Sequence, residues 1–295
     1  MIYTVTLNPA IDHIVTLPTF VRGGLNRAET EAFSFGGKGV NVSRVLKERG
    51  MPSVALGFVA GFTGDMLENG VKANDITTDF IRVVGETRVN TKLSVGGEET
   101  ELNGVGPTVT EADFSKLICK VKLLNSKDVL VLSGSLAKGL AADSYARLAA
   151  AVNPGVRVVV DTAGAPLKAA LAAKPFLIKP NEAELRELCG AGEVPTLAKK
   201  AQVMGARNVL VSCGDAGALL LAENGEIFEC KAPRGTVQST VGAGDALLAG
   251  FLAAVENGKS LAEALTCGVA AGSATAFSVG LAKKEELDAV LAAMK

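Results

Sequence analysis

The sequence predicts an α/β fold in which a mainly parallel sheet is covered by helices on both faces. Short apolar, strand-like runs alternate with stretches of helical periodicity, as in sheets built from strand–helix–strand units. Most of these runs end in polar residues, and parallel sheets bind ligands at the carboxyl ends of their strands. At 295 residues the chain has room for one large α/β domain, or for one large domain and a small one.

The main sheet is predicted from six apolar runs, residues 2–7, 54–59, 129–133, 156–161, 176–179 and 209–213. Helical periodicity is found at residues 40–49, 143–152 and 182–188. The strand ends that we expect at the ligand-binding edge carry Ser133-Gly134-Ser135, Asp161-Thr162, Lys179-Pro180-Asn181 and Ser212-Cys213-Gly214.

A second, smaller sheet is predicted from two segments that break this alternation. Residues 13–17 with 26–35, and 88–95 with 99–103, alternate polar and apolar residues, and Gly96-Gly97 is typical of a hairpin turn. We expect these segments, about 13–35 and 88–103, to form an accessory sheet inserted into a single domain spanning residues 1–295. Its apolar residues Ile14, Leu93, Val95 and Leu102 would be exposed on a single accessory sheet. We therefore predict that the accessory sheet of a second subunit packs over them.

Near the C-terminus, residues 219–221 and 227–230 flank Asn224-Gly225, a second hairpin. Helices are then predicted at residues 243–256, after the capping box of Ser260 and Glu263, and in a last segment with an apolar stripe. That stripe comprises Leu287, Val290, Leu291 and Met294.

Composition excludes several classes of protein. Thirty Lys and Arg against 31 Asp and Glu give a net charge of −1, which disfavours nucleic-acid binding. The single histidine, His13, rules out a multi-histidine zinc site. Five scattered cysteines, expected to be small buried residues, fit a reducing, cytoplasmic setting. No apolar run is long enough to cross a membrane, and residues 1–7 indicate a strand rather than a signal peptide.

Gly242-Ala243-Gly244-Asp245 precedes an apolar helical run. Small residues at a helix start let backbone N–H groups approach an anion, and the helix dipole favours negative charge there. Asp245 in the first turn is expected to stay ionised and could accept a proton from a hydroxyl that attacks a phosphoryl group. The alternative is a structural turn in which Asp245 only complements the dipole.

Gly36-Gly37-Lys38-Gly39-Val40-Asn41 opens another helix and could bind a phosphate or sugar hydroxyls. Its spacing differs from that of a Walker A loop. Taken alone, it is better explained as a strand–helix turn with a solvated lysine.

Asn181-Glu182-Ala183-Glu184 forms a capping box that needs no ligand. Glu184 could also organise Mg²⁺ through water, because that ion uses few carboxylates and keeps several waters. In the accessory sheet, Asp12 could accept sugar hydroxyls and Arg88 could clamp a phosphate. His13 is expected on the other side of the strand, with a structural role.

Taken together and in chain order, the motifs described above resemble those of the phosphofructokinase B branch of the ribokinase-like sugar kinases over essentially the whole chain. Segments 6–12, 87–93 and 100–107 are most similar to bacterial 1-phosphofructokinases, although Val105 stands where many relatives have proline. Tagatose-6-phosphate kinases share the framework but usually differ in the segment Arg88-Val89-Asn90-Thr91-Lys92.

The resemblance implies a ribokinase-like three-layer αβα sandwich with a small β-sheet lid, and a homodimer clasped through that lid. It implies ATP- and Mg²⁺-dependent phosphorylation of fructose 1-phosphate to fructose 1,6-bisphosphate. Asp245 matches the general base, Gly242, Ala243 and Gly244 the anion hole, and Glu184 the magnesium-organising residue. Sugar-phosphate positions are Asp12, Gly37, Lys38, Asn41, Arg88, Asn90 and Ser135, with Asp245. Nucleotide positions are Lys179, Asn181, Ser212, Gly214, Gly217 and Ser273, with Gly242 and Gly244.

Other functions remain open from the sequence. The same chemistry on tagatose 6-phosphate or fructose 6-phosphate is the nearest alternative, and a non-catalytic sugar-phosphate sensor is another. Retention of Asp245 argues against the sensor, since binding alone needs no base. A dinucleotide oxidoreductase is disfavoured because no G-x-G-x-x-G follows the first strand.

Overall fold

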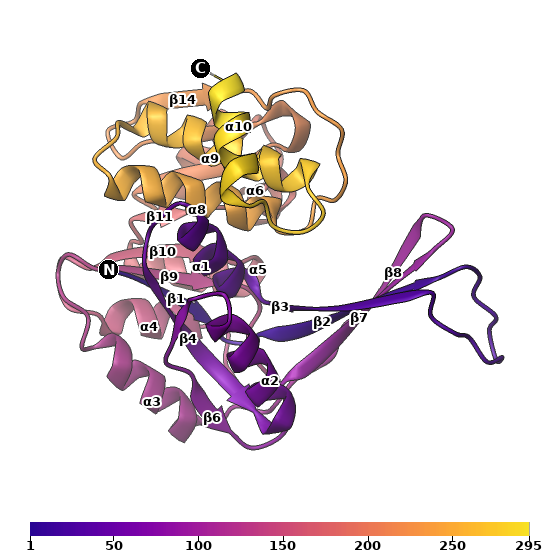
Figure 1. Cartoon of the computed structure of the whole chain (residues 1–295). Coiled ribbons are helices and arrows are strands. Elements are labelled where there is room, and N and C mark those ends of the chain that lie inside the picture. The colour runs from indigo at the N-terminus through magenta and orange to yellow at the C-terminus, as the bar shows by residue number, and fades with distance from the viewer. Residues whose placement is uncertain (295) are drawn as a thin grey trace.

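A central sheet runs through the chain in the computed structural model, which describes residues 1–294 (Figure 1). Its strand order is β14-β13-β12-β11-β10-β9-β1-β4-β5, and β6 also pairs with β4. Pairing is parallel from β12 to β5 and antiparallel in β12–β13 and β13–β14. The bounds are β1 Ile2–Thr6, β4 Ser53–Ala60, β5 Thr77–Thr78, β6 Ile81–Val83, β9 Val129–Ser133, β10 Arg157–Asp161, β11 Leu177–Ile178, β12 Asn208–Ser212, β13 Ala218–Leu221 and β14 Ile227–Cys230.

Strand β9 shows why these segments form a sheet buried on both sides. All of its residues are buried. Leu130 and Leu132 pack into the core on one face, and Val129 and Val131 pack into the core on the other. Aliphatic side chains on both faces suit a parallel strand covered by two helical layers. The predicted mainly parallel sheet is therefore confirmed.

Helices cover both faces and complete three layers. The core on one face receives α3 Glu111–Val121, α4 Ser144–Ala151, α5 Gly164–Ala170, α6 Glu182–Cys189 and α7 Val194–Val203. The opposite face carries α1 Lys38–Glu48, α2 Gly61–Lys72, α8 Ala243–Glu256, α9 Leu261–Phe277 and α10 Lys284–Ala293. Within residues 1–294, none of the helices has the length and apolar character needed to cross a membrane.

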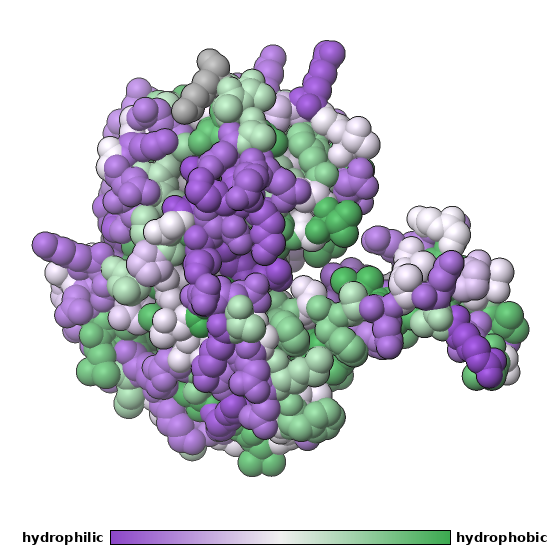
Figure 2. Space-filling view, viewed as in Figure 1, coloured by the Kyte–Doolittle hydropathy of each residue, from purple (hydrophilic) through white to green (hydrophobic). Residues whose placement is uncertain are grey.

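A separate four-stranded sheet projects from this body, both in the ribbon view (Figure 1) and in the space-filling view (Figure 2). Its order is β3-β2-β7-β8, with bounds β2 Ala10–Leu17, β3 Thr30–Gly36, β7 Arg88–Val95 and β8 Glu98–Leu102. Gly96-Gly97 forms the predicted turn between β7 and β8. We call this sheet the lid. The two predicted segments do combine into it, through parallel pairing of β2 with β7.

The register assigns the lid residues to two faces and corrects one expectation. Ile14 pairs with Lys92, whereas Leu93 pairs with Val15. Because side chains alternate along a strand, Ile14 lies on the opposite face from Leu93, Val95 and Leu102. The predicted apolar group is therefore not one surface. The outer face instead carries Phe33, which is 49% exposed, and Leu102, which is 59% exposed.

Some boundaries also differ from those predicted. Strand β3 begins at Thr30 rather than residue 26, because the Asn26 side chain bonds both backbone groups of Val21 and folds the preceding chain into a loop. Helix α1 begins two residues earlier than predicted, directly after Gly37. Of the cysteines, only Cys267 is buried, and Cys119 is exposed, so the expectation of five buried cysteines was wrong.

Candidate active site

Two adjoining cavities, of about 530 Å³ and 600 Å³, lie over the carboxyl ends of the parallel strands. The first lies where the lid meets the body, and the second is lined by the body alone. Asn181, Ser212 and Gly244 line both. Of the predicted residues, the first cavity is also lined by Asp12, Gly37, Lys38, Asn41, Arg88, Asn90, Ser135, Lys179, Glu184, Gly242 and Asp245. The second is also lined by Gly214, Gly217, Ala243 and Ser273. Every residue predicted for the site thus lines one cavity or the other.

The start of α8 separates the two cavities. Gly242 is its N-cap, with a left-handed φ of 81°, and a Cβ there would lie 2.6 Å from the Leu281 side chain. Glycine avoids both the backbone strain and the clash. No side chain caps this helix start. The Ala243 N–H donates to the Thr240 carbonyl at 3.2 Å, and the N–H groups that follow it in the first turn can face an anion.

Asp245 follows in the first turn of α8 and is 6% exposed. Burial, followed by repulsion from Asp161, raises the pKa of Asp245 to about 6. Asn41, Lys179 and Lys38 act in the opposite direction. The helix dipole was expected to keep the group ionised, but burial dominates its titration. A carboxylate with a pKa near 6 is still mainly ionised at neutral pH and is a competent proton acceptor.

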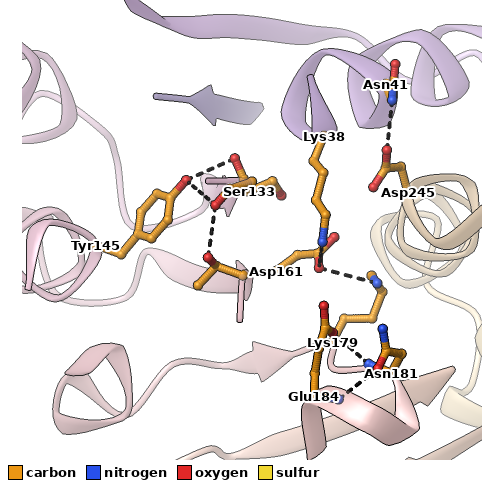
Figure 3. Close-up of polar contacts among 11 residues, drawn as sticks. Lys38, Asn41, Ser133, Tyr145, Asp161, Lys179, Asn181, Glu184 and Asp245 are labelled. Carbon is orange, nitrogen blue, oxygen red and sulfur yellow. Dashed lines mark hydrogen bonds and ion pairs between the residues drawn. The ribbon is translucent and has the colours of Figure 1, made fainter. Parts of the chain in front are cut away.

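Helix α1 brings Lys38 and Asn41 to the same cavity. Gly37, at its N-cap, has φ 114°, and a Cβ there would lie 2.6 Å from Thr6 Cγ2. Only glycine allows the chain to turn this closely over β1. One helical turn further on, Asn41 Nδ2 donates a 2.8 Å hydrogen bond to Asp245 Oδ2 (Figure 3).

The inner face of the lid supplies the opposite wall. Asn90 Nδ2 donates to Asp12 Oδ1 at 2.9 Å, and Lys92 Nζ lies 3.6 Å from Asp12 Oδ2. Lys92 Nζ is also 3.7 Å from Glu101 Oε1. Arg88 Nε donates to the Asn8 carbonyl at 3.1 Å, which fixes the guanidinium at the cavity wall.

Two lysines meet a buried carboxylate beneath the cavity. Lys38 Nζ lies 3.2 Å and Lys179 Nζ 3.3 Å from the same oxygen, Oδ1 of Asp161 (Figure 3). Burial alone would lower the pKa of Lys38, but Asp161, Asp245 and Glu184 outweigh it and raise that pKa. The Lys38 ammonium therefore stays charged.

The capping box of α6 forms as predicted. Asn181 Oδ1 accepts from the Glu184 N–H, and Glu184 Oε2 accepts from the Asn181 N–H, both at 2.8 Å. Glu184 nevertheless lines the first cavity, so capping and ligand binding are compatible. One carboxylate oxygen remains outside the box, and such a donor suits Mg²⁺ held mainly by water and phosphate.

Sequence reasoning missed part of both cavities. In the first, Lys92 and Glu101 could have been found from strand alternation, because they share a face with Arg88 and Asn90. For Asp161 the sequence predicts only the end of a strand at the ligand-binding edge. In the second, the missed wall comes largely from an irregular segment and α9, which carry no motif. It includes Ala232, Pro233, Arg234, Gly235, Val237 and Phe277.

Comparison with known proteins shows which family builds this site. The family model described as pfkB family carbohydrate kinase matches residues 5–287. The chain belongs to the pfkB family of carbohydrate kinases. The ribokinase-like αβα fold and the family resemblance that the sequence predicted are both confirmed.

Individual relatives of this pfkB-family kinase match over nearly its whole length. It is 42% identical to 1-phosphofructokinase of Bacillus subtilis, covering 100% of this chain and 99% of the relative. It is 37% identical to D-tagatose-1-phosphate kinase of Bacillus licheniformis, with coverages of 98% and 96%. Phosphofructokinase-2 of Escherichia coli, solved with substrates and products, has a TM-score of 0.93 at 31% identity, with 99% of each chain covered.

Proposed function

We propose that this kinase transfers the γ-phosphoryl group of ATP to fructose 1-phosphate and forms fructose 1,6-bisphosphate and ADP. The observation that carries the proposal is the buried Asp245 carboxylate at the start of α8, in a cavity that also holds the Arg88 and Lys38 cations. Two full-length relatives, 42% and 37% identical, are named for ketose 1-phosphates, which supports this substrate.

In this proposal the sugar phosphate occupies the first cavity. Asp12, held by Asn90 and Lys92, accepts hydrogen bonds from sugar hydroxyls. Arg88 binds the phosphate already on the substrate, because its fork of donors matches phosphate oxygens. Further contacts come from Gly37, Lys38, Asn41 and Ser135.

Asp245 accepts the proton of the acceptor hydroxyl as its oxygen attacks the γ-phosphorus. The new P–O bond forms while the bond to ADP breaks, and ADP leaves with that electron pair. The anion hole of Gly242, Ala243 and Gly244 at the start of α8 stabilises the charge on the transferred group. Little covalent chemistry is needed from the protein, which suits a chain with one histidine.

ATP occupies the second cavity, where Gly214, Gly217 and Ser273 form part of the wall. Its phosphates extend past Asn181, Ser212 and Gly244, which both cavities share. Glu184, through water, would hold the Mg²⁺ of the nucleotide, and the ion would neutralise phosphate charge. In residues 1–294 no cluster of three or more His, Cys, Asp or Glu side chains could hold a metal. Mg²⁺ usually keeps several waters and binds substrate phosphates, which would supply the other ligands here.

The lid excludes water from the sugar site, because water would otherwise compete with the sugar hydroxyl as phosphoryl acceptor. We propose that two copies of the chain pair through their lids and cover Phe33 and Leu102. In the register these two residues lie in one row across the lid, with His13 and Thr91 between them. The scattered cysteines support a reducing, cytoplasmic setting for the enzyme.

The test is a coupled ADP-release assay with ATP and Mg²⁺ over four acceptors: fructose 1-phosphate, fructose 6-phosphate, tagatose 6-phosphate and fructose. We expect the highest kcat/KM for fructose 1-phosphate. A preference for either 6-phosphate would change the proposed substrate but not the proposed phosphoryl-transfer chemistry. Binding of a ketose phosphate without ADP release would instead indicate a sugar-phosphate sensor.

A further inference from the structure

Asp161 lies beneath the active site at the end of β10 and is only 1% exposed. It pairs in register with Ser133 of β9, which pairs with Thr6 of β1. Its backbone carbonyl accepts from the Gly134 N–H at 3.0 Å, so the backbone that carries the carboxylate is fixed to the edge of the sheet. No motif pointed to this residue.

The two ammonium groups that Asp161 binds come from opposite sides of the site. Lys38 opens α1, and Lys179 follows β11. A Cβ built on Gly244 would lie 3.3 Å from Lys179 Nζ, so this ammonium lies against the residue that lines both cavities. The two lysines therefore converge where a phosphoryl group would pass from the nucleotide to the sugar.

The charges explain how one carboxylate serves two cations. Both lysines contact Oδ1, and within residues 1–294 the other oxygen, Oδ2, has no hydrogen-bond partner. Lys179 is 4% exposed, and such a buried ammonium requires a nearby anion. One negative charge between two positive ones gives these three groups a net charge of +1, so Asp161 holds both ammonium groups without cancelling all the positive charge that they offer to a phosphoryl group.

We propose that Asp161 is a positioning residue for phosphoryl transfer: one oxygen of its buried carboxylate holds the Lys38 and Lys179 ammonium groups at the junction of the two cavities. This inference rests on the proposed kinase function. Asp161 does not contact substrate in this role and acts only through the two lysines and through its charge.

That charge also reaches Asp245. The charged and polar groups that face Asp245 are Asp161 from β10, Lys179 after β11, and Lys38 and Asn41 from α1. Burial and Asp161 raise the pKa of Asp245, and the other three lower it. Removing the Asp161 charge therefore lowers the pKa of Asp245. This shift distinguishes the proposed role from a merely structural one.

The experiment compares wild type with Asp161→Asn, Asp161→Glu and the control Asp128→Asn. Asp128 is also buried, at 5% exposure, but lies at the start of β9, on the opposite edge of the sheet, bonded to the Met1 amino group and the Asn125 N–H. For each protein kcat/KM is measured against pH, together with the thermal midpoint. Turnover by wild type establishes the kinase function independently of the variants.

In Asp161→Asn we expect kcat/KM to fall about 10- to 100-fold, the effect of losing charged hydrogen bonds. We also expect the acid limb of the pH profile, where kcat/KM falls as Asp245 becomes protonated, to move to lower pH. Asp161→Glu keeps the charge, so its acid limb should stay near that of wild type while kcat/KM falls because the lysines are displaced. Asp128→Asn should change stability without moving the acid limb.

Normal kinetics in Asp161→Asn would overturn the proposal, as would a lowered rate with an unmoved acid limb. If Asp161→Asn does not fold, unchanged kcat/KM in Asp161→Glu would overturn it. Failure of both variants to fold would assign Asp161 a structural role instead. Absence of turnover in wild type would contradict the proposed function itself.

Discussion

Asn41 Nδ2 donates a 2.8 Å hydrogen bond to Asp245 Oδ2, although the two residues are 204 positions apart in the chain. The bond joins the starts of α1 and α8, the two helices whose glycine turns open into the first cavity. It stabilises the ionised form of Asp245 and thereby opposes the effect of burial.

Asn41→Ala should therefore raise the pKa of Asp245 further and move the acid limb of kcat/KM to higher pH. In wild type that limb should lie near pH 6, because Asp245 must be deprotonated to accept a proton and its pKa is about 6. Rates measured from pH 5 to 8 test both statements. A limb that does not move would mean that Asn41 has no influence on the base.

Asp245→Asn should lower kcat by about 10²–10⁴, the usual effect of removing a general base. Binding of sugar phosphate, measured by calorimetry, should persist. The fold should not weaken at neutral pH. The folded-state pKa is raised, so the stability that Asp245 contributes is present below its ordinary pKa of 3.8 and is lost as pH rises through about 6. Relative to wild type, the thermal midpoint of the variant should thus be higher at pH 8 than at pH 5. A nearly normal kcat would rule out Asp245 as the base.

Arg88→Ala should raise the KM for the ketose phosphate with little change in kcat, if the phosphate contact is equal in ground and transition states. A lost charged hydrogen bond costs about 1.5–3 kcal/mol, which corresponds to roughly 10- to 150-fold. Arg82→Ala is the matched control, because Arg82 pairs with Asp65 and Glu68 away from both cavities. Equal kinetics in the two variants would remove Arg88 from the phosphate site.

Glu184→Gln should raise the Mg²⁺ concentration needed for half-maximal rate. Glutamine can still accept the Asn181 N–H, so the capping box and the fold should survive. Glu182→Gln, two residues earlier and paired with Arg186, serves as control and should leave the Mg²⁺ dependence unchanged. An unaltered Mg²⁺ titration in Glu184→Gln would limit that residue to helix capping.

Leu102→Glu should dissociate the proposed lid dimer, because a charge would be buried in place of an apolar contact. Analytical ultracentrifugation should then detect monomers, with a lower kcat/KM because the lid is unsupported. Leu123→Glu, at a position 79% exposed that follows α3 rather than lying in the lid, should leave the assembly unchanged. Fully active wild-type monomers at assay concentration would contradict the dimer.

The sequence predicted the parallel sheet, the lid strands and the α8 start well, because each has a local signature. Buried aliphatic runs mark the strands, and Gly242 and Gly37 mark helix starts where a side chain would clash. The dominant influence on Asp245 was not foreseen, since burial depends on how α1 and α8 pack together. Asp161 was predicted only as a strand end at the ligand-binding edge, because its contacts with Lys38 and Lys179 form only in three dimensions.

The long stretch of sequence between Asn41 and Asp245 also has a consequence for synthesis on the ribosome. The predicted sugar-binding residues other than Asp245, from Asp12 to Ser135, leave the ribosome well before Asp245. At about 5–20 residues per second, the intervening 110 positions (245 minus 135) take roughly 5–20 s to translate. During that interval the nascent chain carries the sugar-binding residues without the proposed base. A truncated translation product that stops before α8 should therefore have no kinase activity.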